Sequence, residues 1–227
     1  MTDFKRYAIY YAPQPGALAD FGASWLGWDL AQGCACPYAD IAGLDAEKLT
    51  ATPHKYGLHG TVKPPFFLAE GTSFDDLCHA TQAHCASQNA VQLDGLVLSR
   101  LGGFLALKVT GEANSLAALA GETVRTLDRF RAPASETELA RRRKSGLTAR
   151  QEALLTQWGY PYVMEEFRFH ITLTGRLGAQ QAEATRSALA PVLEPILPTP
   201  FLVHDLCLAG EDSDGKFHLI HRYPLSA

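Results

Sequence analysis

Two short stretches of the sequence place a histidine two residues before a threonine, inside runs that are typical of β-strands. The first contains His59 and Thr61, and the second contains His170 and Thr172. Side chains of a strand alternate between its two faces, so each histidine shares a face with its threonine. An imidazole can transfer a proton, and a neighbouring hydroxyl can donate a hydrogen bond to the same substrate. These four residues are the candidate catalytic groups.

Two such motifs in one cleft could open a cyclic phosphodiester. This hydrolysis needs a base that deprotonates water and an acid that protonates the leaving oxygen. Imidazole suits both roles, because its unperturbed pKa of about 6.5 lies near working pH. The hydroxyls of Thr61 and Thr172 could donate to the non-bridging oxygens, where charge develops. A lone strand histidine is usually structural, so this interpretation requires His59 and His170 to meet. The sequence leaves open which of them is the base.

The sequence after each motif follows the same order of elements, which predicts a duplicated fold. A helix comes first, over residues 73–88 in the first half and 179–193 in the second. A pair of strands follows each helix, and the spacing from histidine to strand pair is nearly equal in the two halves. The predicted strands cover residues 91–101, 104–109, 201–208 and 216–223. We therefore expect two equivalent lobes, approximately residues 52–110 and 163–225, related by a pseudo-two-fold axis.

These patterns together predict an α+β fold for residues 1–227. We expect a single bilobal domain in which two mainly antiparallel sheets form a central cleft and helices lie on the outside. Residues 6–12 are expected to add a strand and residues 18–31 a helix. An insertion over residues 131–162 contains a dense basic run at residues 141–144. This run is either a solvated face or a flap that carries cations to an anionic substrate, because arginine matches phosphate oxygens with its planar donors.

Two basic residues beside the motifs are candidate phosphate contacts. Lys63 follows Thr61 by two positions, and Arg168 precedes His170 by two. Strand alternation would place each of them on the same face as its motif. A solvated lysine at the end of a strand explains Lys63 equally well.

The remaining substrate-binding candidates are three tyrosines and an arginine. Tyr56 and Tyr162 are near the motifs in sequence, and Arg142 belongs to the basic run. Tyr7 lies on the first expected strand and could line the cleft, although packing in the core explains it equally well.

Charge and cysteine content narrow the classes of function. The net charge of −4 argues against a broad nucleic-acid or anionic-membrane surface, but not against a local phosphate pocket. No apolar run approaches the roughly 20 residues that cross a bilayer. Five scattered cysteines are typical of reduced thiols in a cytoplasmic protein. Cys78, His79, His84 and Cys85 do not share one face of the expected helix, so we predict no metal site and no cofactor.

The chain resembles the 2H phosphoesterase superfamily. Its members carry two His-x-Thr or His-x-Ser motifs on two pseudo-symmetric lobes, and they include 2′,3′-cyclic nucleotide phosphodiesterases and bacterial RNA 2′-5′ ligase-like proteins. The chain is especially similar to a branch of proteins associated with bacterial phosphonate catabolism. The resemblance lies in stretches that span nearly the whole chain, namely residues 6–13, 25–27, 59–66, 158–163 and 169–175.

The residues and the resemblance together predict a metal-independent 2H-type cyclic phosphodiesterase. We expect it to hydrolyse a cyclic phosphodiester of a small sugar phosphate or nucleotide in the cytoplasm, and the resemblance implies phosphonate catabolism as its pathway. One alternative is an RNA 2′-5′ ligase or an RNA-end cyclic phosphodiesterase, which needs a basic groove that the net charge disfavours. The other is a non-enzymatic module that binds a phosphorylated metabolite. The expected partner is a small phosphorylated substrate, with RNA less favoured and no membrane.

Overall fold

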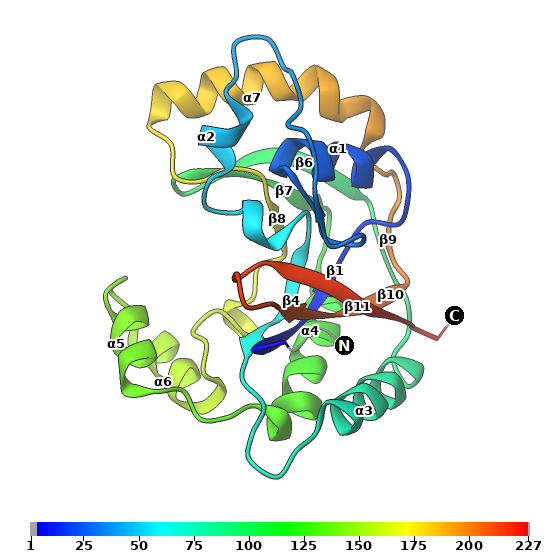
Figure 1. Ribbon diagram of the computed structural model, residues 1–227, viewed down its shortest axis with the longest axis vertical. Coiled ribbons are helices and arrows are strands. Elements are labelled where there is room, and N and C mark those ends of the chain that lie inside the picture. The colour runs from blue at the N-terminus through cyan, green and yellow to red at the C-terminus, as the bar shows by residue number, and fades with distance from the viewer. Residues whose placement is uncertain (1–3, 227) are drawn as a thin grey trace.

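A long antiparallel sheet forms the centre of the protein (Figure 1). The computed structural model describes residues 4–226. In this range the sheet has seven strands in the order β11-β10-β1-β4-β8-β7-β6, and each neighbouring pair is antiparallel. The strands are β1 (Arg6–Tyr11), β4 (Gly60–Phe66), β6 (Gly95–Leu101), β7 (Phe104–Thr110), β8 (His170–Thr172), β10 (Asp205–Glu211) and β11 (Phe217–Pro224).

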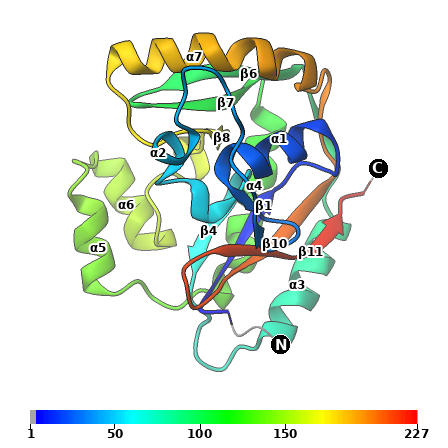
Figure 2. The same ribbon diagram turned by 45° about the horizontal axis from the view of Figure 1, so that its top comes forward.

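Short strand pairs and helices surround this sheet. The pairs are β2 (Trp28–Asp29) with β3 (Cys34–Ala35), and β5 (Val91–Leu93) with β9 (Phe201–Val203). The helices are α1 (Ala17–Leu26), α2 (Ala46–Thr50), α3 (Phe74–Ala86), α4 (Asn114–Leu127), α5 (Glu136–Arg143), α6 (Ala149–Trp158) and α7 (Ala179–Leu193). Helix α7 packs on β6 and β7, whereas α3 packs on β10 and β11 (Figures 1 and 2). The predicted α+β class, with antiparallel strands inside and helices outside, is confirmed.

The sheet consists of two halves that meet at the two motifs. Strands β11, β10, β1 and β4 form one half, and β8, β7 and β6 form the other. Gly60 of β4 pairs with Ile171 of β8, and within residues 4–226 this is the single strand pairing between the halves. The two lobe sheets that the sequence predicts are therefore continuous, and they join at the residues that follow each histidine.

Each half of the sheet combines a motif from one half of the sequence with a hairpin from the other. The β4 strand lies with the hairpin of β10 and β11, and β8 lies beside the hairpin of β6 and β7. The order strand, helix and hairpin after each motif is as expected, and each half of the sheet takes strands from both of the ranges 52–110 and 163–225. Local sequence patterns define strands without defining their partners, because pairing depends on contacts between distant segments.

Element boundaries differ from the sequence-based expectation where glycine or a short break intervenes. Helix α1 ends at Leu26, because Gly27 adopts a left-handed conformation with φ 66° and caps the helix. Each of the long strands expected at residues 91–101 and 201–208 is divided into two strands, and the first parts, β5 and β9, pair with each other away from the main sheet. Helix α7 spans residues 179–193, as expected.

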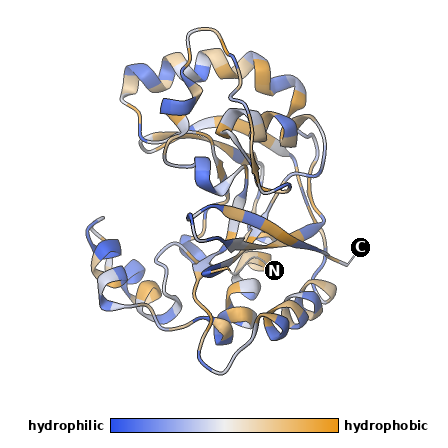
Figure 3. Ribbon diagram, in the orientation of Figure 1, coloured by the Kyte–Doolittle hydropathy of each residue, from blue (hydrophilic) through white to orange (hydrophobic). Residues whose placement is uncertain are grey.

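The insertion over residues 131–162 forms the helices α5 and α6, which lie to one side of the sheet (Figure 1). Helix α6 begins with a capping box between Thr148 and Gln151, and Ser135 caps α5 by accepting a hydrogen bond from the backbone of Glu138. Helix α5 buries none of its residues and is mostly hydrophilic (Figure 3). No helix in residues 4–226 is both long enough and apolar enough to span a membrane.

Candidate active site

The pairing of Gly60 with Ile171 positions the four motif residues. In an antiparallel pair the register continues symmetrically, so His59 lies across from Thr172 and Thr61 lies across from His170. Cβ atoms of directly opposite residues are about 5 Å apart, and those of diagonal neighbours are about 7–8 Å apart. This arrangement brings two imidazoles and two hydroxyls to one face of the sheet.

All four motif residues line one cavity of about 520 Å³. This volume is in the range of sites for small ligands, roughly 300–1,000 Å³. Five basic side chains and no carboxylate also line the cavity, although the whole chain carries a net charge of −4. The basic residues are Arg6, Lys55, Arg141, Arg142 and Arg176. The cavity is therefore suited to a small anion.

His59 is held at the start of β4 by its own backbone and by Thr61. Its Nδ1 lies 3.1 Å from the carbonyl oxygen of Gly57, and its Nε2 lies 3.1 Å from Oγ1 of Thr61. A carbonyl can only accept, so Nδ1 carries the proton and Nε2 of the neutral ring accepts a hydrogen bond from Thr61. Burial lowers the pKa of His59 to about 4; the hydrogen bond to Gly57 opposes this shift, and His170 adds to it.

His170 is anchored in the same way as His59. Its Nδ1 donates to the carbonyl oxygen of Arg168 at 2.8 Å, again two residues before the histidine. Within residues 4–226, Nε2 of His170 has no hydrogen-bond partner, and the ring of Phe104 packs beside it with centroids 5.8 Å apart. Both motifs therefore fix Nδ1 on a backbone carbonyl and leave Nε2 as the nitrogen that is not bound to the backbone.

Lys63 does not face the cavity, contrary to the sequence-based expectation. Tyr10 of β1 pairs with Thr61, but Ile9 pairs with Lys63, so β4 contains one extra residue at this point. Such a β-bulge reverses the alternation of side chains beyond it. The Lys63 side chain is buried, and its Nζ donates to Oδ1 of Asp128 at 3.1 Å. Lys63 is a structural residue of the core, neither a phosphate contact nor a solvated lysine.

Three other candidates also lie outside this cavity. Arg168 and Tyr162 line an adjoining hollow of about 650 Å³ that shares His170 with the cavity. The Arg168 Nη1 atom donates to the carbonyl oxygens of Glu165 and Phe167, because β8 begins only at His170 and alternation does not extend back to residue 168. Tyr7 is buried and stacks on Phe74 with ring centroids 5.5 Å apart, so it belongs to the core.

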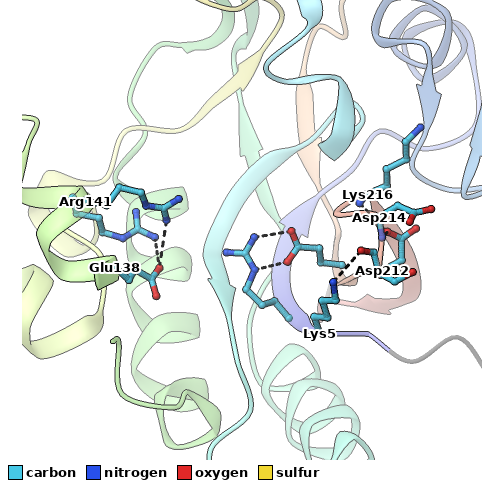
Figure 4. A network of polar contacts seen from close by, with 10 residues as sticks. Lys5, Glu138, Arg141, Asp212, Asp214 and Lys216 are labelled. Atoms are coloured by element: carbon cyan, nitrogen blue, oxygen red, sulfur yellow. Dashed lines mark hydrogen bonds and ion pairs between the residues drawn. The ribbon is translucent and has the colours of Figure 1, made fainter. Parts of the chain in front are cut away.

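Tyr56 and Arg142 are the substrate-binding candidates that the structure places in the cavity. The Tyr56 ring lies 5.6 Å from the ring of His59, measured between centroids. The Arg142 guanidinium lies over Tyr160 at 4.6 Å and is held by Glu138, whose Oε1 accepts from Nη2 at 3.1 Å. In Figure 4, Glu138 and the neighbouring Arg141 project from α5 on the side that faces the strands.

Sequence reasoning missed several residues of this cavity. The most prominent is Tyr10, which is fully buried and whose ring centroid lies 4.0 Å from that of His59. It is on the opposite face of β1 from Tyr7, and only the register with β4 shows which face meets the motif. Tyr160 and Arg176 were also missed, although each belongs to or directly follows a stretch that carries the family resemblance.

The sequence predicts no metal site at Cys78, His79, His84 and Cys85, the residues that were considered for one. In the described part of the chain, no group of three or more His, Cys, Asp or Glu side chains is placed to hold a metal ion. His84 is buried and bonds Oγ1 of Thr123 through Nε2 at 2.9 Å, which is a packing role.

The fold and the site define a class of protein: an α+β protein in which two His-x-Thr strands meet at the centre of an antiparallel sheet. This is the arrangement that the resemblance to 2H phosphoesterases implied. Residues 61–218 match the family described as "Protein of unknown function (DUF1045)", and the chain belongs to this family.

Three further similarities accompany the family match. The chain is 38% identical over 218 residues to "Ribose 1,5-bisphosphate phosphokinase PhnN" of Janthinobacterium sp. (strain Marseille), covering 92% of this chain and 48% of that protein. The chain thus spans about half the length of the curated relatives it matches, or less. A phosphoesterase crystal structure is similar with 14% identity and a TM-score of 0.46, over 99% of this chain and 100% of the other. E. coli LigT complexed with NADP+ gives 13% identity and a TM-score of 0.45, over 100% of both chains.

Proposed function

We propose that this protein is a metal-independent phosphoesterase that hydrolyses a cyclic phosphodiester of a small sugar phosphate or nucleotide. The observation that carries the proposal is the matched anchoring of His59 and His170. Each Nδ1 is bound to a backbone carbonyl, so each Nε2 is available to exchange a proton in the same cavity.

Hydrolysis needs one imidazole that accepts a proton and one that donates a proton. The pKa of His59 is lowered to about 4, so His59 is neutral at neutral pH and can accept a proton. The second proton transfer then falls to Nε2 of His170, which has no hydrogen-bond partner within residues 4–226. We assign His59 as the general base and His170 as the general acid for hydrolysis.

The chemical step follows from these assignments. His59 Nε2 takes a proton from water as the water oxygen bonds to phosphorus, and the bond from phosphorus to the leaving oxygen breaks. His170 Nε2 gives its proton to that oxygen, so the product is a phosphate monoester with a free hydroxyl. The Thr61 hydroxyl, which donates to His59 in the free protein, turns to a non-bridging phosphate oxygen together with Thr172. Proton exchange with solvent then restores the starting states.

The substrate class is supported by the cavity and by the relatives. The cavity is lined by five basic side chains and no carboxylate, which favours a small phosphorylated molecule. The relatives are named for an activity on ribose 1,5-bisphosphate, and this name supports a ribose phosphate as the kind of substrate. The chain lacks the Gly-x-x-x-x-Gly-Lys-Ser/Thr loop that binds nucleoside triphosphates, so we assign hydrolysis to it instead of phosphorylation. Phosphonate catabolism, which the sequence resemblance implies, is the pathway we propose.

Assays of the purified protein with a panel of cyclic phosphates test this function. The panel contains 2′,3′-cyclic nucleotides and cyclic phosphates of ribose, each with and without a second phosphate group, in the presence of EDTA. We expect at least one compound to be converted to a monoester at a rate that EDTA does not change. Loss of turnover on chelation contradicts metal independence. Binding without turnover of any compound would favour a non-enzymatic binding module.

A further inference from the structure

Three tyrosines and one arginine line the cavity, and two of the tyrosine rings pack against His59. These residues, Tyr10, Tyr56, Tyr160 and Arg142, are called the tyrosine–arginine cluster below; all four line the cavity. Their contacts connect them: the rings of Tyr10 and Tyr56 both pack against His59, and Arg142 stacks on Tyr160. Tyr56 and Tyr160 also contribute, after burial, to the raised pKa of Tyr10, so both lie in its neighbourhood.

The hydrogen-bonding groups of this cluster are largely unused by the protein. The Oη of Tyr10 is buried without a partner, and so is the Nε of Arg142. Among residues 4–226, the hydroxyls of Tyr56 and Tyr160 also have no hydrogen-bond partner. Arg142 uses one nitrogen, Nη2, to hold Glu138, and leaves its other two unbonded. Buried polar groups without partners destabilise the folded protein, so two of them in the lining of one cavity indicate a ligand that completes their hydrogen bonds.

The chemistry of the cluster favours a phosphate group as that ligand. Arginine nitrogens donate only, and phenol hydroxyls can all donate to one acceptor group. Burial raises the pKa of Tyr10 and of Tyr160, so both phenols keep their protons near neutral pH. Glu138 accepts a hydrogen bond from the guanidinium but does not line the cavity, and no carboxylate is among the lining residues.

We propose that the tyrosine–arginine cluster is a second anion subsite, which binds a non-reacting phosphate group while the histidine pair acts on the other. The substrate is then a sugar cyclic phosphate that carries a second phosphate. This inference rests on the proposed function for the role of the histidines, but the cluster itself does not depend on it. The proposal gives the insertion a role in binding, because Arg142 comes from α5 and Tyr160 follows α6. Tyr10 comes from β1, and Tyr56 comes from the short 3-10 helix His54–Tyr56 before β4.

Anions in the cavity can be located by anomalous diffraction from crystals soaked in tungstate, a heavy analogue of phosphate. We expect two tungstate ions in the wild-type protein, one between His59 and His170 and one at the cluster. The double variant Tyr10→Phe/Arg142→Gln should lose the second ion and keep the first. The matched control is Arg143→Gln on the same helix, since Arg143 pairs with Glu152 outside the cavity; it should keep both. A single ion at the histidines of the wild-type protein overturns the proposal, as does a second ion that the double variant retains.

Kinetics on a matched substrate pair give the second readout. For the cyclic phosphate that the enzyme hydrolyses, the ratio of kcat/KM with and without a second phosphate should fall about tenfold to hundredfold in the double variant, because charge-assisted hydrogen bonds to one phosphate are lost. An unchanged ratio refutes the subsite and leaves the phosphoesterase proposal standing. Two tungstate ions in a protein that hydrolyses no cyclic phosphate have the opposite meaning: the subsite stands and the proposed activity fails.

Discussion

Gly60 pairs with Ile171 across β4 and β8, and this backbone pair joins the two halves of the sheet. Each of the two residues directly follows a motif histidine. The pair therefore sets the separation of His59 and His170, although the two histidines are far apart in the sequence. The geometry of the site depends on this junction being rigid and closely packed.

Substitution Gly60→Ala should disturb the junction. A Cβ atom at this position would lie 2.4 Å from the ring of Phe169, which is buried and cannot move away easily. We expect a loss of about 1–3 kcal/mol in the free energy of unfolding, measured by urea denaturation, and at least a tenfold fall in kcat. Gly178→Ala is the control, because that glycine has φ −65° and nothing within 4 Å of the added atom. Equal effects of the two substitutions would contradict a special role for Gly60.

Substitution Thr61→Val should weaken the chemical step more than binding. It keeps the shape of the side chain but removes the hydroxyl that donates to His59 and, in the proposed reaction, to the phosphate. We expect kcat to fall about 100-fold, as when a single donor to the developing charge is removed. Thr61→Ser, which restores the hydroxyl, should recover most of the rate. A variant with valine that keeps wild-type kcat would remove Thr61 from the mechanism.

The protonation of His59 can be followed by NMR titration of its ring protons. The expected pKa is about 4, lowered first by burial and also by the nearby His170. Catalysis by a neutral His59 should fall as pH decreases through this value, because the base becomes protonated. Substitution His170→Ala should raise the pKa of His59. A pKa near 6.5 in the wild-type protein would show that the ring is solvated and is not the preformed base.

The buried ion pair of Lys63 and Asp128 makes a prediction about stability. Burial lowers the pKa of Lys63 to about 8, although Asp128 opposes the shift. Between about pH 8 and pH 10.5 the unfolded chain keeps the Lys63 proton while the folded protein releases it, so the free energy of unfolding rises with pH in this window. The gain relative to Lys63→Met should be on the order of 3 kcal/mol, measured by denaturation at several pH values. A parallel pH dependence in the two proteins would show that Lys63 is solvated.

Removing the carboxylate of the same ion pair should lower the free energy of unfolding strongly. Asp128→Asn leaves a buried ammonium without its carboxylate, whereas Lys63→Met leaves Asp128 with Arg131, whose Nε donates to it at 2.8 Å. We expect Asp128→Asn to destabilise the protein by about 3–5 kcal/mol at pH 7 and Lys63→Met by less. The reverse order of stability would contradict this description of the core.

The sequence reveals the strands, the helices and the two motifs, because these depend on local periodicity. Helix α7 and strand β1 follow from such patterns, and His59 shares a face with Thr61, as alternation requires. The partners of each motif strand do not follow, since β4 pairs with β1 on one side and with the distant β8 on the other.

The contrast between Lys63 and Tyr10 shows where sequence reasoning about the site fails. Alternation predicts that Lys63 lies on the same face as Thr61, but one extra residue in β4 directs the Lys63 side chain into the core. Tyr10 reaches the site because it pairs with Thr61, and nothing in its own strand distinguishes it from Tyr7 or Tyr11. Bulges and registers are properties of strand pairs, so one strand read alone does not contain them.

The most direct test of the site compares hydrolysis of the best cyclic phosphate by wild type, His59→Ala, His170→Ala and the double variant, with EDTA present. His79→Ala, an exposed histidine on α3, serves as the control. If the two imidazoles act together in one step, each single variant should lose at least about 100-fold in kcat, and the double variant should lose little more than either. Near wild-type rates in either single variant, or losses that simply multiply in the double variant, would contradict the paired acid and base mechanism.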